Sequence, residues 1–350
     1  SSLIFASAGS AVGALCLLSI CLLLLAISFT SFSLVTIYFP VLTIVLLICI
    51  AYAIFALSRY YKDRKDAAHI RVAFEHYVPK RIVQEMVNNP AAVKLGGERK
   101  KITVLFTDLA GFTSLSERTE AEELSELLND HLDRMTKIIA SYEGTVDKFI
   151  GDAIMAFWGA PVIAEDQATR AVECACEMQE AMEVMREEYR AEGRPELHMR
   201  VGINTCEAIV GNMGGEDRFD YTAIGDGVNL AARLEGANKA YGTGILISGS
   251  TASELPSELL VCLIDRVRVK GKKEPAPVFT TVKETSTVTV CENLAAAMSA
   301  CDWAVAAELT ERLRPVPQMQ HFSALMDQRI EENRHKSPGE WDGVTDLDKL

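Results

Sequence analysis

Two aspartates stand where apolar runs of the chain end, and carboxylates in such places can hold a divalent cation. Asp108 closes the run "ITVLFTDL", and Asp152 lies at the tip of "KFIGDAIMAF", between two apolar arms. Taken singly, each aspartate also fits an ordinary turn residue. If the two strands are neighbours, the two carboxylates repel unless cations neutralise them, which is the arrangement of two-metal phosphoryl chemistry.

The stretch after Asp108, "LAGFTSLSE", is a glycine-containing turn that leads into a helix. The backbone N–H groups at Gly111, Phe112 and Thr113 would point at an anion there, because a helix N-terminus favours negative charge. We therefore expect a phosphate group beside the metal pair. All-oxygen ligands suit Mg²⁺ or Mn²⁺, with two ions per site.

The elements that must position these residues alternate between strands and helices. The expected strands are 102–109, 144–151, 152–159, 197–204, 207–213, 244–248 and 266–271, of which 197–204 and 207–213 would form a second hairpin. The expected helices are 119–142, 164–190 and 228–240, with one or two more in the tail. The order strand, helix, strand, strand, helix, strand predicts an α+β, ferredoxin-like βαββαβ unit with additions.

The chain of 350 residues divides sharply by charge. Residues 1–58 contain no Asp, Glu, Lys, Arg or His, so the net charge of −13 falls entirely on the remainder. An acidic surface argues against non-specific nucleic-acid binding, which needs clustered basic residues. The nine cysteines include no CxxC pair, which favours reduced thiols in a cytosolic compartment.

Two apolar runs, Leu3–Ile27 and Leu34–Leu57, are each long enough to cross a bilayer. A signal peptide followed by a buried core helix is the alternative, but that pattern needs a basic segment in front of a single short apolar core. Basic residues follow the second run, so we expect the catalytic part to lie in the cytoplasm beneath the inner membrane. An extracytoplasmic sensor would need a further upstream span that this chain does not contain.

These patterns predict four regions. Residues 1–58 are two transmembrane helices, 59–98 a helical connector and linker, 99–285 the catalytic domain and 286–350 a helical tail. In the connector, apolar residues recur at roughly helical spacing, which is typical of a packing or dimer seam.

Four stretches in series, "VLFTDLAGFTSLSE", "GTVDKFIGDAIMAFWGAP", "DYTAIGDGVNLAARLE" and "VKGKKEPAPVF", resemble the signatures of class III nucleotidyl cyclases. The resemblance covers about Ala73 to Lys283. The apolar hairpin, the connector "AFEHYVPKRIVQEMV" and the tail "WDGV" resemble bacterial adenylate cyclases that carry a CHASE-type extracellular sensor. The sensor is absent from this chain.

The resemblance implies roles for individual residues. Asp108 and Asp152 match the metal pair, and the Leu109 carbonyl would also face a metal. Lys148 matches the residue that reads the adenine ring, with Thr222 as its partner. A lysine donor suits the adenine N1 acceptor, whereas guanine carries an N–H there. A hydroxyl can donate or accept, so Thr222 alone leaves the base open.

Three further residues match positions that handle the sugar and the phosphates. Asn229 matches the ribose-orienting residue, Arg233 the transition-state arginine, and Lys270 the triphosphate-binding lysine. Asn229 and Arg233 are at i and i+4 and so share one helix face. An arginine fork suits phosphate oxygens on which charge develops.

The implied activity is conversion of ATP to cyclic AMP and pyrophosphate by a symmetric homodimer. In the family, the metal residues come from one subunit, and the base-reading and arginine residues from the other. The alternatives are a guanylate cyclase, which Lys148 disfavours, a catalytically silent nucleotide-binding receptor, and a structural membrane scaffold. The complete residue set argues against the receptor, and a scaffold would not need two carboxylates at strand ends.

Overall fold

The computed structural model describes residues 96–215, 219–268, 274–337 and 340–347, together with Ala26, Phe29 and Ile50. All the helices and strands below belong to the unit Gln84–Leu350. The predicted membrane hairpin and most of the predicted connector lie outside the described residues. In the described part of the chain, no helix is long and apolar enough to cross a membrane.

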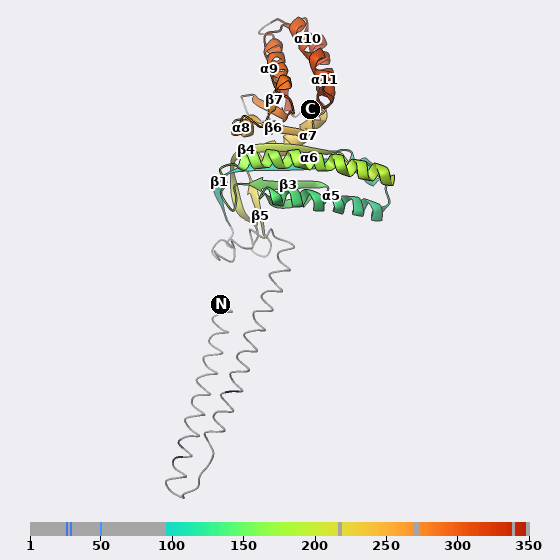
Figure 1. Ribbon diagram of the computed structural model, residues 1–350. Helices are drawn as coiled ribbons and strands as arrows, with labels where there is room; N and C mark the ends of the chain where they lie inside the picture. Colours follow the sequence, from blue (N-terminus) through green and yellow to red (C-terminus); the bar gives the residue numbers. More distant parts are fainter. Residues whose placement is uncertain are drawn as a thin grey trace. The chain divides into compact units, whose positions relative to one another are not determined.

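Four strands and two helices form the centre of this unit. They are β1 (Gly96–Leu109), α5 (Ala121–Ser141), β2 (Thr145–Ile150), β3 (Ala153–Trp158), α6 (Gln167–Glu192) and β4 (Met199–Gly214). The strands lie in the order β2-β3-β1-β4 and each neighbouring pair is antiparallel. This is the predicted βαββαβ unit, so the α+β prediction is confirmed (Figure 1).

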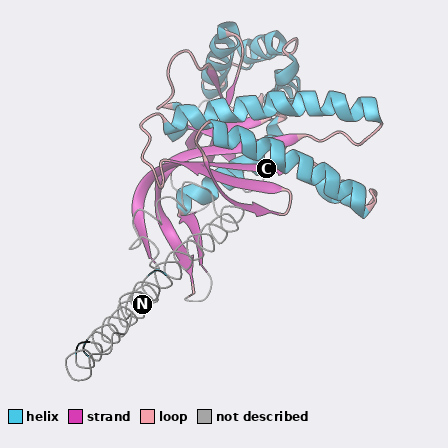
Figure 2. Ribbon diagram, turned by 60° about the horizontal axis from the view of Figure 1, so that its bottom comes forward, coloured by secondary structure: helices cyan, strands magenta, loops and turns pink. Residues whose placement is uncertain are grey.

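The two faces of the sheet carry different helices. Helices α5 and α6 lie together over one face (Figure 2), where Leu105 and Leu109 of β1 enter their core. Residues Ile102 and Val104 of β1 belong to a second core that includes residues of α7 (Asp226–Tyr241). Since side chains alternate along a strand, Asp108 shares the face of Ile102 and Val104, toward α7.

The second predicted hairpin is wrong. Strand β4 continues through positions 204–206, where a turn was expected, and pairs with β1 along its length. The polar residues at these positions have partners in the fold, on α7 for Asn204 and on β1 for Thr205. The Asn204 amide donates to the Gly227 carbonyl at 2.7 Å, and Thr205 Oγ1 lies 2.9 Å from Thr103 Oγ1.

The remaining strands extend the sheet beyond β4. Strand β5 (Phe219–Ile224) forms the actual hairpin with the end of β4, and β6 (Ile245–Ser248) lies parallel to its beginning. Strands β8 (Ala276–Thr281) and β7 (Val261–Arg268) follow. Strand β1 begins at Gly96, earlier than predicted, and the part of the predicted strand 266–271 beyond Arg268 lies outside the described residues.

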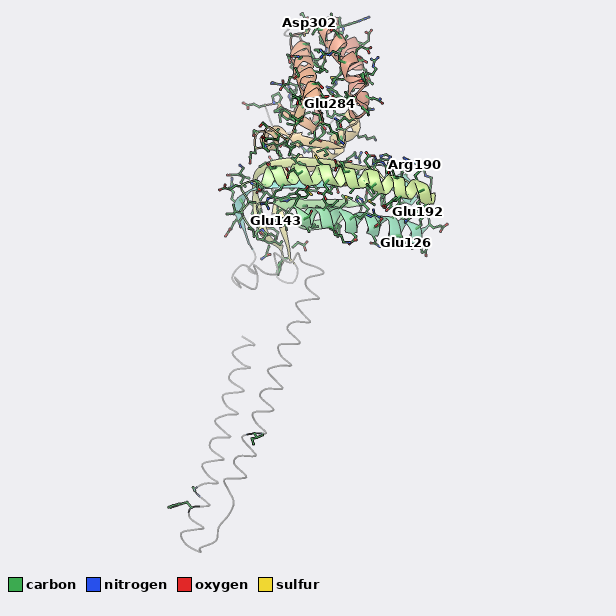
Figure 3. All side chains as sticks on the ribbon, viewed as in Figure 1. Glu126, Glu143, Arg190, Glu192, Glu284 and Asp302 are labelled. Carbon is green, nitrogen blue, oxygen red and sulfur yellow. The ribbon has the colours of Figure 1, made fainter. Side chains whose placement is uncertain are left out.

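The tail contains three described helices where one or two were expected. They are α9 (Thr285–Ser299), α10 (Trp303–Leu313) and α11 (Gln320–Asn333), followed by the short strand β9 (Thr345–Asp346) beside β7. Their buried faces share one core with α7 and with β6 to β8. The end of the α5–α6 layer where α5 begins and α6 ends is polar, and Glu126, Arg190 and Glu192 are exposed at its surface (Figure 3).

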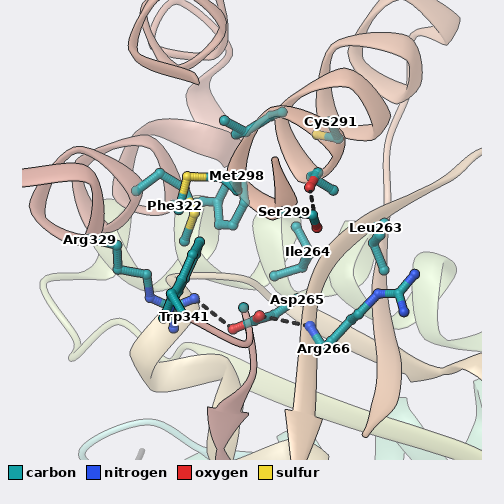
Figure 4. A pocket seen from close by; sticks show the side chains of 14 residues that line it. Leu263, Ile264, Asp265, Arg266, Cys291, Met298, Ser299, Phe322, Arg329 and Trp341 are labelled. Carbon is teal, nitrogen blue, oxygen red and sulfur yellow. Dashed lines mark hydrogen bonds and ion pairs between the residues drawn. The ribbon is translucent and has the colours of Figure 1, made fainter. Parts of the chain in front are cut away.

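The buried carboxylate of Asp265 connects this tail to β7 and α7 through hydrogen bonds. Asp265 of β7 accepts hydrogen bonds from the Tyr241 hydroxyl of α7, Arg329 of α11 and the Thr345 hydroxyl of β9, each at 2.7 Å. A cavity of about 50 Å³ lies beside it, lined in part by Arg329 and Trp341 (Figure 4). Four elements that are distant in sequence therefore meet at one charge.

Removing this charge is expected to destabilise the chain strongly. Asp265→Ala leaves the Arg329 guanidinium buried without its partner, which costs about 3–5 kcal/mol of unfolding free energy. Asp342→Ala, which removes an exposed ion pair with Arg268 at 2.8 Å, is the control and should cost at most about 1 kcal/mol. Urea unfolding of the full chain, followed by tryptophan fluorescence, measures both, and equal effects would contradict the role of Asp265.

Candidate active site

Asp108 and Asp152 lie side by side, as their positions at strand ends predicted. Thr107 of β1 is paired with Ile154 of β3, which brings the turn before β3 against the end of β1. The backbone N–H of Leu109 donates to Oδ2 of Asp152 at 3.2 Å. This hydrogen bond holds the Asp152 carboxylate next to the residue that follows Asp108.

Glycines shape the two turns that present these carboxylates. Gly151 forms the tip before Asp152 with φ 67°, and Gly111 lies at φ 76° just before the short helix α4 (Phe112–Ser116). Both values fall in the left-handed region that favours glycine. The predicted phosphate-binding residues 111–113 thus form the turn between Asp108 and α4, and their role stays a prediction.

An arginine that sequence reasoning missed completes the acidic end of the sheet. Arg200 of β4 lies directly opposite Asp108 of β1 and donates to Oδ2 of that carboxylate. The Nε of Arg200 also lies 3.0 Å from Oε1 of Glu235 on α7, an ion pair without hydrogen-bond alignment. Helix α7 can approach so closely because Gly202 has no side chain: a Cβ there would lie 2.2 Å from the Glu235 nitrogen.

The carboxylates at this edge are held under mutual repulsion. Burial raises the pKa of Asp152, and the charge of Asp108 raises it further. Burial, together with the charge of Asp108, raises the pKa of Glu235 to about 7, against the lowering effect of Arg200. Three carboxyl groups thus face one guanidinium, which leaves negative charge that a further cation can balance.

The donor set at this edge fits Mg²⁺ or Mn²⁺. No group of three or more His, Cys, Asp or Glu side chains that could hold a metal occurs in the described part of the chain. A hard cation of this kind is usually bound through one or two carboxylates, with water and substrate phosphates as its other ligands. Asp108 and Asp152 supply two such carboxylates.

The predicted base-reading residues also lie together, joined by a residue that sequence reasoning did not single out. The Thr222 hydroxyl of β5 donates to Oδ2 of Asp147 at 2.5 Å, and the Lys148 ammonium lies 3.3 Å from the other oxygen of the same carboxylate. Thr222 and Lys148 are far apart in sequence: Lys148 lies on β2, at one edge of the sheet, and Thr222 lies on β5, which pairs with β4. Asp147 is the group that connects them.

Of the three remaining predicted site residues, the structure describes two. Asn229 is exposed on α7, and Arg233 is half-buried one turn further along the same helix. Lys270 lies outside the described residues. Glu235, which as a near neighbour of Arg233 could have formed an ordinary exposed helix pair with it, is largely buried and pairs with Arg200 instead.

Two groups of site residues therefore exist in one chain. One is the acidic edge, defined by Asp108, Asp152, Arg200 and Glu235. The other, which we call the base-reading group after its predicted role, is defined by Asp147, Lys148 and Thr222. Within the described ranges, no hydrogen bond or ion pair joins the two groups. The contact of Arg200 with Asp108 could have been found only from the β1–β4 register. Asp147 could have been found only from its position next to Lys148.

Two curated adenylate cyclases are similar to this chain in sequence. Adenylate cyclase 1 of Rhizobium meliloti (strain 1021) is 35% identical over 209 residues, covering 60% of this chain and 31% of that protein. Adenylate cyclase of Anabaena cylindrica is 35% identical over 216 residues, covering 59% of this chain and 42% of that protein. The chain thus spans less than half the length of these two curated relatives.

Solved structures give the same result. The crystal structure of the adenylyl cyclase CyaB from P. aeruginosa matches with a TM-score of 0.51 and 43% identity, covering 54% of this chain and 97% of that one. Residues 97–282, more than half of the chain, match the family described as the adenylate and guanylate cyclase catalytic domain. The chain belongs to this class III cyclase family.

Proposed function

We propose that this chain is an adenylate cyclase, which converts ATP to 3′,5′-cyclic AMP and pyrophosphate with two divalent metal ions at a homodimer interface. The observation that carries the proposal is the pair of carboxylates, Asp108 and Asp152, at neighbouring strand ends together with the Lys148–Thr222 pair. The first group suits a metal-bound triphosphate and the second suits the adenine edge. The named adenylate cyclases among the relatives support the same substrate.

The reaction is an intramolecular transfer at the α-phosphorus. The ribose 3′ oxygen forms a bond to that phosphorus, the bond to the pyrophosphate oxygen breaks, and the 3′ hydroxyl proton is released. Asp108, Asp152 and the Leu109 carbonyl would hold Mg²⁺ or Mn²⁺, which would supply Lewis-acid stabilisation of the attacking oxygen and the phosphates.

The protein side chains position the substrate for this step. Asn229 orients the ribose, and Arg233, one turn later on α7, donates to the phosphate oxygens as their charge grows. Lys270 and the turn at residues 111–113 bind the remaining phosphates. Most of the rate enhancement then comes from alignment and electrostatics, as in other phosphoryl transfers.

The homodimer is supported by an exposed apolar surface near the base-reading group. Phe149 and Ile150 of β2 follow Lys148 and are about half exposed, and Ile209 and Ile224, paired across β4 and β5, are similarly exposed. Large apolar side chains gathered in this way favour burial by a partner. Because no hydrogen bond or ion pair among the described residues joins the two groups of one chain, we infer that a second copy completes each site.

We further propose that residues 1–58 anchor the enzyme as a multi-pass protein of the inner membrane, with the catalytic unit in the cytoplasm. The absence of any charged residue from this stretch supports the anchor, and the basic residues that follow support the orientation. A sensor upstream would then act through the connector at residues 59–98.

The direct test is turnover of the full chain with ATP or GTP, each with Mg²⁺ or Mn²⁺. We expect cyclic AMP formation from ATP to exceed cyclic GMP formation from GTP by at least about tenfold in kcat/KM, because Lys148 meets an acceptor on adenine and a donor on guanine. A preference for GTP would point to a guanylate cyclase, and the absence of turnover with every combination would support a silent nucleotide-binding receptor.

The metal assignment predicts loss of activity in both aspartate variants, and for Asp152 without loss of stability. Asp108→Asn and Asp152→Asn should each lower kcat/KM for ATP at least about 100-fold, since a metal contributes several kcal/mol to such transition states. Asp152→Asn should not lower the thermal unfolding temperature, because its carboxylate is repelled by Asp108. Unchanged turnover in Asp108→Asn would show that the metal assignment is wrong.

The shared site predicts complementation between inactive chains. Mixing Asp108→Asn with Arg233→Ala chains should restore about a quarter of wild-type activity, because half of randomly formed dimers are mixed and each holds one intact site. Mixing Asp108→Asn with Asp152→Asn chains is the control and should restore none, because both lesions affect the same half of each site. Equal results for the two mixtures would contradict a site shared between subunits.

A further inference from the structure

The base-reading group contains a carboxylate that the proposed reaction does not use. Asp147 precedes Lys148 on β2, and its side chain has no exposed surface. One of its oxygens accepts the Thr222 hydroxyl, while the other is buried without a well-aligned hydrogen bond, 3.3 Å from the Lys148 ammonium. A buried carboxylate is costly, so its position calls for a physical reason.

A β-bulge in β2 sets the direction of the Asp147 side chain. Val146 is paired with Ala156 and Lys148 with Met155, so Asp147 is an extra residue that no residue of β3 opposes. In a regular strand, Asp147 and Lys148 would point to opposite faces. A bulge can change the direction of a side chain in this way, and here the Asp147 carboxylate contacts Thr222 through one oxygen and lies near the Lys148 ammonium with the other.

The bond between Thr222 and Asp147 fixes the direction of the hydroxyl. A carboxylate only accepts hydrogen bonds, so the single hydroxyl proton of Thr222 is committed to Asp147. The lone pairs of the Thr222 oxygen are then all that this side chain can offer to a base. Burial raises the pKa of Asp147, while the hydrogen bond from Thr222 and the adjacent Lys148 ammonium act in the opposite direction and favour the charged, accepting form.

The two purines differ at the groups that would meet this pair. Adenine presents an amino donor at C6 and an acceptor at N1, whereas guanine presents an acceptor at O6 and a donor at N1. An accepting Thr222 and a donating Lys148 therefore match adenine at both positions and oppose guanine at both. A threonine free to turn its proton outward could donate to O6 of guanine as well.

We propose that Asp147 is a positioning residue for base selection: it orients the Thr222 hydroxyl so that this side chain accepts from adenine and rejects guanine. This inference rests on the proposed function, because it assigns Lys148 and Thr222 to the base of the nucleotide. Asp147 itself touches no substrate. It acts on selectivity through the direction of one hydrogen bond.

The test is the ratio of kcat/KM for ATP to kcat/KM for GTP in the full chain. Asp147→Asn keeps the shape but provides both a donor and an acceptor, so Thr222 is no longer held in one direction. We expect the ATP:GTP ratio to fall at least about tenfold, which is the effect of one hydrogen bond of the wrong polarity. In a Thr222→Val background, the same change should lower the ratio much less, because no hydroxyl remains to orient.

A structural role would give a different result. The matched control is Asp265→Asn, which changes another buried and hydrogen-bonded carboxylate, remote from the base-reading group. This variant should leave the ATP:GTP ratio unchanged. Equal loss with ATP and GTP in Asp147→Asn, or the same fall of the ratio with and without the Thr222 hydroxyl, would overturn the proposal. If thermal unfolding shows that the Asp147→Asn chain is not folded, Asp147→Ser gives the same comparison.

Binding separates this proposal from the proposed function. The affinities of 2′,3′-dideoxy-ATP and 2′,3′-dideoxy-GTP, which lack the attacking hydroxyl, give the same ratio without turnover. Absence of cyclic AMP formation by the wild-type chain would count against the proposed function, while a fall of the binding ratio in Asp147→Asn would still support the role of Asp147. An unchanged binding ratio would overturn that role even in an active enzyme.

Discussion

The pairing of β1 with β4 runs without a break from Gly96 opposite Asn212 to Leu109 opposite Met199, and both groups of site residues depend on it. At one end it sets Asp108 opposite Arg200. At the other end β4 continues into the hairpin with β5, which carries Thr222. A slip of one residue would turn Asp108 to the other face of the sheet, so the hydrophobic alternation that fixes this register also fixes the site.

Charge compensation at the acidic edge has a fixed part and an exchangeable part. Arg200 is the fixed part, because a guanidinium keeps its proton and is held between Asp108 and Glu235 from two different elements. It cannot neutralise Asp152 as well. The raised pKa of Asp152 reflects burial and this residual repulsion, and under the proposed function divalent cations relieve it when the nucleotide binds.

The sequence predicted those parts of the fold that depend on local pattern. Helices α5 and α6 follow from apolar periodicity, and the placement of Asp108 and Asp152 follows from apolar strands that end in turns. The predicted second hairpin is wrong because Asn204 and Thr205 also fit a turn until their partners, on α7 and on β1, are known. The roles of residues 1–58 and of Lys270, which lie almost wholly outside the described residues, stay predictions.

The missed site residues share a cause. Arg200 reaches Asp108 only through the strand register, and Glu235 reaches Arg200 only because Gly202 lets α7 come close. Asp147 contacts Thr222 only because β2 contains a bulge, and no residue type in β2 predicts that bulge. Each contact joins residues that lie far apart in the chain, so spacing along the sequence contains no trace of it.

The two groups of site residues also differ in how complete they are before a nucleotide binds. In the base-reading group, a buried carboxylate, a committed hydroxyl proton and a nearby ammonium already define the direction of each hydrogen bond. The acidic edge keeps uncompensated charge and is completed only by cations and phosphates. Preorganised groups lose little freedom on binding and so discriminate well, while an edge with unmatched charge gains most when the charged substrate arrives. Under the proposed function, selection of the base is therefore built into each chain, and the catalytic centre forms only with its ligands and a second chain.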